Sequence, residues 1–175
     1  MTAGNLRSWF DATVLDRLMP PRKVYAHCDI PCGIYDPHEA QVAALTVLRM
    51  DQLIKEAGAP NKDTKPEEYS AWVSKVARYT AVKEQHAERV KQEVRVIWGD
   101  YFTPDLAKAQ PDIHETVWKI MKQASKARQG TTQTDAEELV KLVQEFAEKF
   151  WTSKNVKTRR IPTQQKVGGE FVVPA

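Results

Sequence analysis

The sequence has few glycines, only two cysteines and no long run of apolar residues. Seven glycines among 175 residues exclude a collagen-like or glycine-rich low-complexity chain. A membrane-spanning helix needs roughly 18 to 20 successive apolar residues, and because no such run is present we expect no membrane partner. With 42% hydrophobic and 28% charged residues, a chain of this length is typical of one folded domain.

The net charge of +3 is concentrated at the two ends of the chain. Residues 1–26 carry a net charge of +2 and residues 153–175 carry +4, so the residues between them carry −3. A folded surface that binds nucleic acid would place basic residues on one face of the domain. This distribution therefore predicts no nucleic-acid partner, and a basic tail is the simpler interpretation.

Four segments have the apolar spacing of amphipathic helices. The first and second begin at Pro37 and Pro66, because proline is favoured in the first helical turn, and the first ends at Gly58. The third ends before Gly130, and the fourth begins with a possible capping box at 134–137. The expected helices cover approximately residues 37–57, 66–98, 111–129 and 134–152.

These segments predict an all-α fold in which residues 36–152 form an antiparallel four-helix bundle. Residues 153–175 lose the helical period and contain Pro162 and Gly168, so we expect a flexible basic C-terminal extension. Residues 27–35 precede the first helix, and we expect them to form an N-terminal metal-binding hook.

Both cysteines of the chain, Cys28 and Cys32, lie in this hook, where Pro31 and Gly33 disfavour a regular helix. A disulfide between them would close a very small loop and constrain little else. A structural zinc site normally has four protein ligands, and a thiol redox pair more often has the spacing Cys-x-x-Cys beside a strand. A redox-active metal site fits the segment better than these three alternatives.

Cleavage between Ala26 and His27 would create a planar set of donors. The new α-amine, the amide nitrogen and thiolate of Cys28, and the thiolate of Cys32 would form an N₂S₂ plane, with the imidazole of His27 available as an axial ligand. Planar coordination with nitrogen and thiolate donors suits copper(II) or nickel(II). The residues alone leave the choice between these two metals open.

The hook reads His-Cys-x-x-Pro-Cys-Gly-x-Tyr over residues 27–35. This pattern resembles the signature of the nickel-containing superoxide dismutase family. Every fixed residue of that signature is present at residues 27–35 of this chain. The resemblance continues in Lys-Glu-Gln at 83–85 and in Ile-Trp-Gly-Asp-Tyr-Phe at 97–102. It covers roughly residues 27–152, which makes it far more specific than an isolated pair of cysteines.

The resemblance implies an antioxidant oxidoreductase that converts superoxide to oxygen and hydrogen peroxide by cycling one nickel ion per subunit between Ni(II) and Ni(III). The implied ligands are the amine and imidazole of His27, the amide and thiolate of Cys28, and the thiolate of Cys32. The family fold is a four-helix bundle assembled into a homohexamer, and the segment before the hook is removed by proteolysis.

Two further residues of the hook are candidates for the catalytic site beside His27. The resemblance places Tyr35 next to the open face of the metal, where its hydroxyl can order water or limit the access of anions; simple packing is the alternative. Asp29 is expected to orient the hook through backbone hydrogen bonds, and its alternative role is only to form a turn. Tyr101 resembles a family residue near the site, and an aromatic core position is equally compatible.

The chain departs from the family pattern at two positions. Known members place a glutamate that supports the axial imidazole where Ala43 stands here, and an arginine where His86 stands. We expect His86 to take over the support of His27 by a hydrogen bond. His38 and His114 are expected to be helix-surface residues rather than ligands.

Residues 1–26 are interpreted as a pro-segment. Val24-Tyr25-Ala26 looks like a signal-peptidase site, but Asp11, Asp16 and Arg17 interrupt the region where a signal peptide needs an apolar core. The expected localisation is therefore cytoplasmic, and the expected partner is a maturation peptidase that cleaves between Ala26 and His27.

Two other functions use the same sequence features. A non-catalytic nickel or copper binding and delivery protein would use the hook without turnover. A helical interaction module would use the bundle surface, where Trp72, Trp98, Trp118 and Trp151 fall at helical positions. Loss of Cys28 and Cys32 would leave only the interaction module functional.

Overall fold

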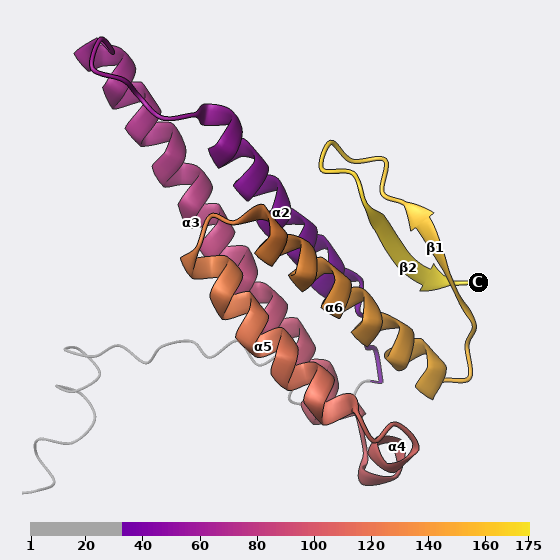
Figure 1. Cartoon of the computed structure of the whole chain (residues 1–175). Coiled ribbons are helices and arrows are strands. Elements are labelled where there is room, and N and C mark those ends of the chain that lie inside the picture. Colours follow the sequence, from indigo (N-terminus) through magenta and orange to yellow (C-terminus); the bar gives the residue numbers. More distant parts are fainter. Residues whose placement is uncertain (1–32) are drawn as a thin grey trace, which may run out of the picture. The chain divides into compact units, whose positions relative to one another are not determined.

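The computed structural model describes residues 33–175, which include every helix expected from the sequence. The expectation of an all-α fold is confirmed in part, because the described chain is mostly helical but ends in two strands (Figure 1). Its helices are α2 (His38–Ala57), α3 (Pro66–Val96), the π-helix η1 (Ile97–Tyr101), α4 (Pro104–Ala109), α5 (Ile113–Gln129) and α6 (Gln133–Ser153), followed by the strands β1 (Thr158–Pro162) and β2 (Glu170–Pro174).

Helix α2 starts where the sequence predicts, directly after Asp36 and Pro37. The Asp36 carboxylate accepts the backbone N–H of His38 at 2.8 Å. Helix α3 has Pro66 in its first turn, which suits a position where the backbone N–H has no helical partner. Both helix starts therefore follow from local sequence.

Three details of the predicted helices are wrong. The second helix changes to a π-helix at Ile97 instead of continuing as an α-helix to residue 98, and the short helix α4 follows it. Helix α6 has Thr132 at its N-cap, without a side-chain cap, so the predicted capping box at 134–137 does not form. The physical reason is that Thr134 already lies inside the helix, while Glu137 accepts a hydrogen bond from Gln133 at 2.8 Å.

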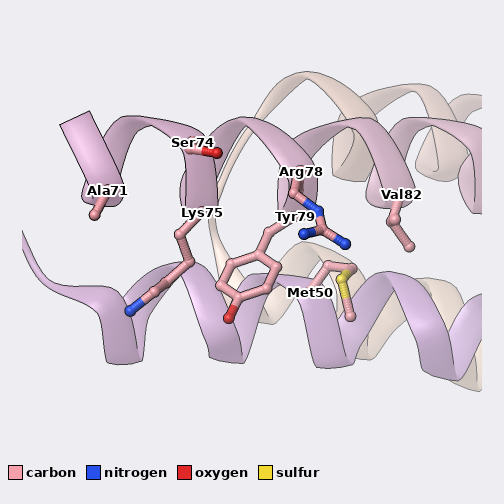
Figure 2. Close-up of a pocket in the computed structure, with 7 residues that line it drawn as sticks. All are labelled: Met50, Ala71, Ser74, Lys75, Arg78, Tyr79 and Val82. Carbon is pink, nitrogen blue, oxygen red and sulfur yellow. The ribbon is translucent and has the colours of Figure 1, made fainter.

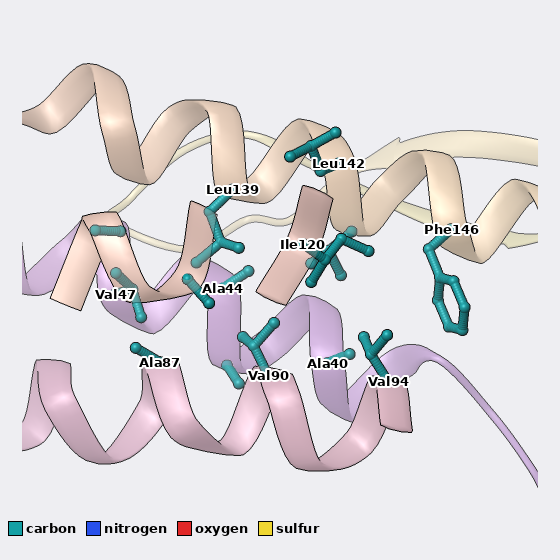
Figure 3. Close-up of a cluster of buried hydrophobic side chains, with 14 of the residues drawn as sticks. Ala40, Ala44, Val47, Ala87, Val90, Val94, Ile120, Leu139, Leu142 and Phe146 are labelled. Carbon is teal, nitrogen blue, oxygen red and sulfur yellow. The ribbon is translucent and has the colours of Figure 1, made fainter. Parts of the chain in front are cut away.

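The four long helices, α2, α3, α5 and α6, bury their apolar faces against one another (Figure 3). The apolar spacing of residues 37–57 predicts a buried seam that includes Ala43, Val47, Met50 and Ile54. This is confirmed at Ala43 and Val47, while Met50 and Ile54 are only half-buried. Burying a large aliphatic or aromatic side chain contributes roughly 1.5–3 kcal/mol. Fully buried members of the core include Ala40, Ala44, Ala87, Val90, Val94, Ile113, Ile120, Leu139, Val143, Phe146 and Phe150.

A charged pair is buried among these helices. Lys83 of α3 and Asp51 of α2 are each 1% exposed, and the Lys83 ammonium donates to the Asp51 carboxylate at 3.1 Å and to the carbonyl of Gly130. Burial raises the pKa of the Asp51 carboxyl, and the hydrogen bond from Lys83 only partly offsets this. Lys83 therefore connects α2, α3 and the loop between α5 and α6.

The C-terminal residues differ from the expected flexible extension. Strands β1 and β2 form an antiparallel hairpin, with Ile161 paired to Phe171, and the hairpin packs on α2 and α6 (Figure 1). The physical reason is long-range, because Val172 is 2% exposed against the helices and its backbone bonds the side chain of Gln41, 131 residues earlier. Loss of helical period was a correct observation, but it does not imply flexibility.

Within residues 33–175, none of the helices combines the length and apolar character required to cross a membrane.

Candidate metal centre

The predicted metal ligands His27, Cys28 and Cys32 lie outside the described residues, and so does Asp29. The structure begins at Gly33, whose φ of +73° is a left-handed conformation that favours glycine. Ile34 follows with 76% of its surface exposed. The described part of the candidate site therefore consists of the last residues of the hook and the elements that they contact.

Tyr35, the last fixed residue of the hook pattern, lies against an aromatic cluster. Its ring centroid is 5.7 Å from that of Tyr101, with an interplanar angle of 52°. The Tyr101 ring in turn lies 4.9 Å from Phe150 and 5.2 Å from Phe102. Such tilted and edge-to-face pairs each contribute about 0.5–1.5 kcal/mol beyond burial, so the end of the hook is held against η1 and α6.

The same cluster carries polar and charged groups. The Tyr101 hydroxyl and the Ser153 hydroxyl are 2.8 Å apart. The Lys154 ammonium lies 4.9 Å from the centroid of the Tyr101 ring and 5.1 Å from that of Phe150. A cation over aromatic faces is favourable electrostatically, and this one places a positive charge beside the Tyr35–Tyr101 pair.

The sequence singled out Tyr101 but not Lys154 or Ser153, because these residues stand at the end of the last helix, far from the hook in sequence. The signal that could have found them is the helical period of α6, which places Phe150 and Lys154 on one face four residues apart. Their contact with Tyr101 depends on packing between elements that are about fifty residues apart in the chain.

The two departures from the family pattern occupy different environments. Ala43 is 1% exposed and belongs to the apolar core. His86 is half-buried on α3, and its Nδ1 lies 2.9 Å from the carbonyl oxygen of Val82. Since a carbonyl oxygen only accepts hydrogen bonds, Nδ1 carries a proton in this contact. The expected hydrogen bond from His86 to His27 stays a prediction, because His27 lies outside the described residues.

The remaining histidines of the described chain are exposed. The His38 ring packs on Phe171 at 5.0 Å, and His114 Nδ1 accepts the indole N–H of Trp98 at 2.9 Å. Among residues 33–175, no group of three or more His, Cys, Asp or Glu side chains could hold a metal ion.

A shallow cleft lies elsewhere, between the C-terminal half of α2 and the N-terminal half of α3 (Figure 2). It is lined by Met50, Lys75, Arg78, Tyr79 and neighbouring small residues. Met50 is roughly 18 Å along the helix axis from His38, at about 1.5 Å per residue. The cleft is therefore remote from the start of α2, where the hook joins the helices.

Comparisons with known proteins place these observations in context. The family model described as "Nickel-containing superoxide dismutase" matches residues 22–154. The "Superoxide dismutase [Ni]" of Streptomyces seoulensis is 34% identical over 142 residues, which cover 81% of this chain and 98% of that protein. The protein of the same name from Streptomyces coelicolor is 32% identical over the same shares of the two chains.

Solved structures give the same result. A native nickel superoxide dismutase structure superimposes with a TM-score of 0.61 and 30% identity, covering 73% of this chain and 99% of that one. A structure of a nickel-containing superoxide dismutase with ligation corresponding to the oxidised state gives a TM-score of 0.63, 29% identity and coverage of 74% and 99%. Residues 155–175, which include both strands, lie beyond the stretch that the family model matches.

Proposed function

This chain belongs to the nickel-containing superoxide dismutase family, and from that membership we propose that it disproportionates superoxide at a nickel ion held by His27, Cys28 and Cys32. The matched segment runs from before the hook to the end of α6. The motif and the helices are thus matched as one unit, and this observation carries the proposal.

The chemistry of the donor set fits nickel. Two thiolates, an imidazole and an amine freed by cleavage before His27 are the donors that the hook offers. Thiolate and nitrogen donors suit nickel and copper in planar geometry, and the family membership favours nickel. Tyr35 adds a phenol directly after these donors, and its contact with Tyr101 fixes the end of the hook on the helices.

When bound, nickel would supply a one-electron couple between Ni(II) and Ni(III), which is the chemistry that disproportionation of superoxide requires. Two superoxide anions and two protons yield one O₂ and one H₂O₂. The residues of the chain therefore have to hold the donors, admit an anion and deliver protons.

We assign these tasks to named residues. His27 would supply its imidazole to the nickel, and Asp29 would orient the hook through backbone hydrogen bonds. The Tyr35 hydroxyl orders water and limits anion access, supported by the packing of its ring on Tyr101. Lys154, over the Tyr101 ring, favours the approach of an anion because positive charge near a site raises the local concentration of anionic substrate.

The finer organisation is also part of the proposal. Residues 1–26 form a pro-segment removed by a maturation peptidase between Ala26 and His27, residues 27–35 form the nickel hook, and residues 36–152 form an antiparallel four-helix bundle. The mature protein acts in the cytoplasm as a homohexamer with one nickel per subunit. The order of α2, α3, α5 and α6 and the packing of these helices against one another support the bundle.

The test compares two nickel-loaded forms, the chain that begins at His27 and the uncut chain. We expect only the cut form to disproportionate superoxide, because the α-amine exists only after cleavage. Nickel bound without turnover by the cut form would instead favour a nickel or copper binding and delivery protein. A C28S/C32S variant is the control, and it should bind no nickel at the hook.

A further inference from the structure

The C-terminal hairpin, residues 158–174, makes specific contacts with the start of α2. The Gln41 side chain is 3% exposed, and its amide makes two hydrogen bonds with the backbone of Val172. The Gln41 Nε2 donates to the Val172 carbonyl at 3.0 Å, and the Gln41 Oε1 accepts the Val172 N–H at 2.7 Å. One amide thus satisfies both backbone groups of a strand residue, in the way that a neighbouring strand would.

Further contacts extend along the same helix. The Phe171 ring packs on His38 at 5.0 Å, and Gln52 donates to the Val167 carbonyl at 3.3 Å. Gly169, with φ of +81°, approaches Leu45 so closely that a Cβ there would lie 3.3 Å from the Leu45 Cδ2. The hairpin therefore follows α2 over about four turns, from His38 to Gln52.

The first turn of α2 also has local and apolar contacts. The Asp36 carboxylate accepts the His38 N–H at 2.8 Å, and Ala40 is fully buried in the core. The ion pair between Glu39 and Arg89, at 2.7 Å, joins two side chains that are each more than half exposed, and exposed ion pairs contribute little. Helix ends tend to open locally when tertiary contacts are weak, and the contacts with Val172 and Phe171 add a directional long-range attachment at this position.

We propose that the hairpin is a positioning element for the nickel hook, with Gln41 as the positioning residue. The hook joins α2 directly, through residues 33–37, so any opening of the first turn of α2 changes where Tyr35 and the hook are anchored. The inference rests on the proposed function and adds to it a segment that lies beyond the residues matched by the family model.

The first measurement needs no metal. In the full-length, metal-free chain, backbone hydrogen exchange is compared between Gln41→Met and the control Gln133→Met. Gln133 is half-buried and, like Gln41, is bonded through its amide, but to Glu137 of its own helix. We expect exchange of the amides of residues 38–45 to become roughly tenfold faster in Gln41→Met, because two hydrogen bonds are lost, and to be unchanged in the control.

The second measurement uses the cut, nickel-loaded protein. Gln41→Met is expected to broaden the Ni(III) EPR spectrum and lower kcat, while Gln133→Met leaves both unchanged. The effects of Gln41→Glu on the EPR spectrum and on kcat should be smaller than those of Gln41→Met, because the Glu carboxylate still accepts the Val172 N–H. A variant on the hairpin itself, Phe171→Ala, should act in the same direction as Gln41→Met, which guards against a folding defect specific to position 41.

Two results separate the possible failures. If the hairpin amides exchange faster in Gln41→Met while residues 38–45 and the EPR spectrum stay unchanged, the positioning role is overturned. If the wild-type cut protein binds nickel but shows no turnover, the proposed function fails, and the exchange measurement still decides whether the hairpin orders the start of α2.

Discussion

The four long helices bury aliphatic and aromatic side chains against one another, whereas the C-terminal hairpin is attached to them largely through amide side chains. In the helices, residues such as Val90, Leu139 and Phe146 are completely buried. In the two strands, only Val172 is buried. The hairpin is bonded by Gln41 of α2, which contacts Val172, and by Gln144 of α6, which contacts Glu170.

This difference shows how two parts of one domain can differ in stability. Apolar burial acts over a broad surface and does not depend on one contact, so the helices are expected to open only when the domain unfolds. The hairpin depends on a few directional hydrogen bonds, each contributing about 0.5–1.5 kcal/mol. We therefore expect variants in the helices to change global stability and variants at the hairpin contacts to change local protection.

The largest expected effect is at the buried ion pair. Lys83→Met removes the only described hydrogen-bonding partner of the Asp51 carboxylate and leaves that group in the core, since Oδ2 has no partner among residues 33–175. Breaking a buried pair in this way typically costs about 3–5 kcal/mol. Urea unfolding of the metal-free protein measures the loss of unfolding free energy.

The matched control for this variant is the double substitution Asp51→Leu with Lys83→Met, which removes both charges. Because two desolvated charges are replaced by apolar side chains, much of the lost stability should return. A double variant as unstable as Lys83→Met alone would contradict the assignment of the loss to an uncompensated charge.

An intermediate effect is expected at Gln144, which holds the hairpin on α6. Its Nε2 donates to the Glu170 carbonyl at 2.7 Å, and its Oε1 accepts from Arg160 at 3.1 Å. Gln144→Leu removes this hydrogen bond, and because Glu170 is exposed the expected cost is that of one net hydrogen bond, about 0.5–1.5 kcal/mol. Native-state hydrogen exchange should show faster exchange in β1 and β2 and no change at Val90 or Ile120. Equal acceleration in both regions would mean that the hairpin and the helices open together.

The smallest effect is expected at the surface of the helices, where Lys149 of α6 pairs with Asp112 at 2.6 Å. The hydrogen bond from Lys149 holds the pKa of the Asp112 carboxyl below its ordinary value of 3.8. A lowered folded pKa stabilises the fold above pH 3.8, and that contribution is lost as the pH falls through the lowered value. Because Asp112 is half exposed, Asp112→Asn should cost only about 0.2–1 kcal/mol at pH 7.

The pH dependence provides the check on that prediction. Thermal unfolding of Asp112→Asn and wild type should differ at pH 7, the difference should shrink as the pH falls below 3.8, and 1 M salt should reduce it at pH 7. A difference that does not respond to either acid or salt would show that the pair's charge is not its cause.

The helix starts and much of the core were predictable because they depend on neighbouring residues. Pro37 and Pro66 mark the starts of α2 and α3, and the apolar spacing identified Ala43 and Val47 as buried. The end of α3 was not predictable in the same way, because η1 places Tyr101 against Phe150 of a distant helix. The capping box predicted at 134–137 does not form. Its residues fit the motif, but α6 already begins at Gln133, so Thr134 is not at the N-cap.

The candidate site was predicted from one short motif. The pattern at 27–35 identified the family, and the comparisons confirm it. The roles of Tyr35, Asp29 and His27 stay predictions. The motif gave no indication of Lys154 or Ser153, because their contacts with Tyr101 connect residues about fifty positions apart.

The sequence by itself determined the helical class, the starts of α2 and α3, and the family, because each depends on residues close together in the chain. Only the tertiary structure decided that Lys83 bonds Asp51 inside the core, that Tyr35 packs on Tyr101, and that residues 158–174 form a hairpin bonded to Gln41. The physical reason is that a helix reports its own period in sequence, whereas a hydrogen bond between Gln41 and Val172 depends on how distant segments pack, and no local pattern records that.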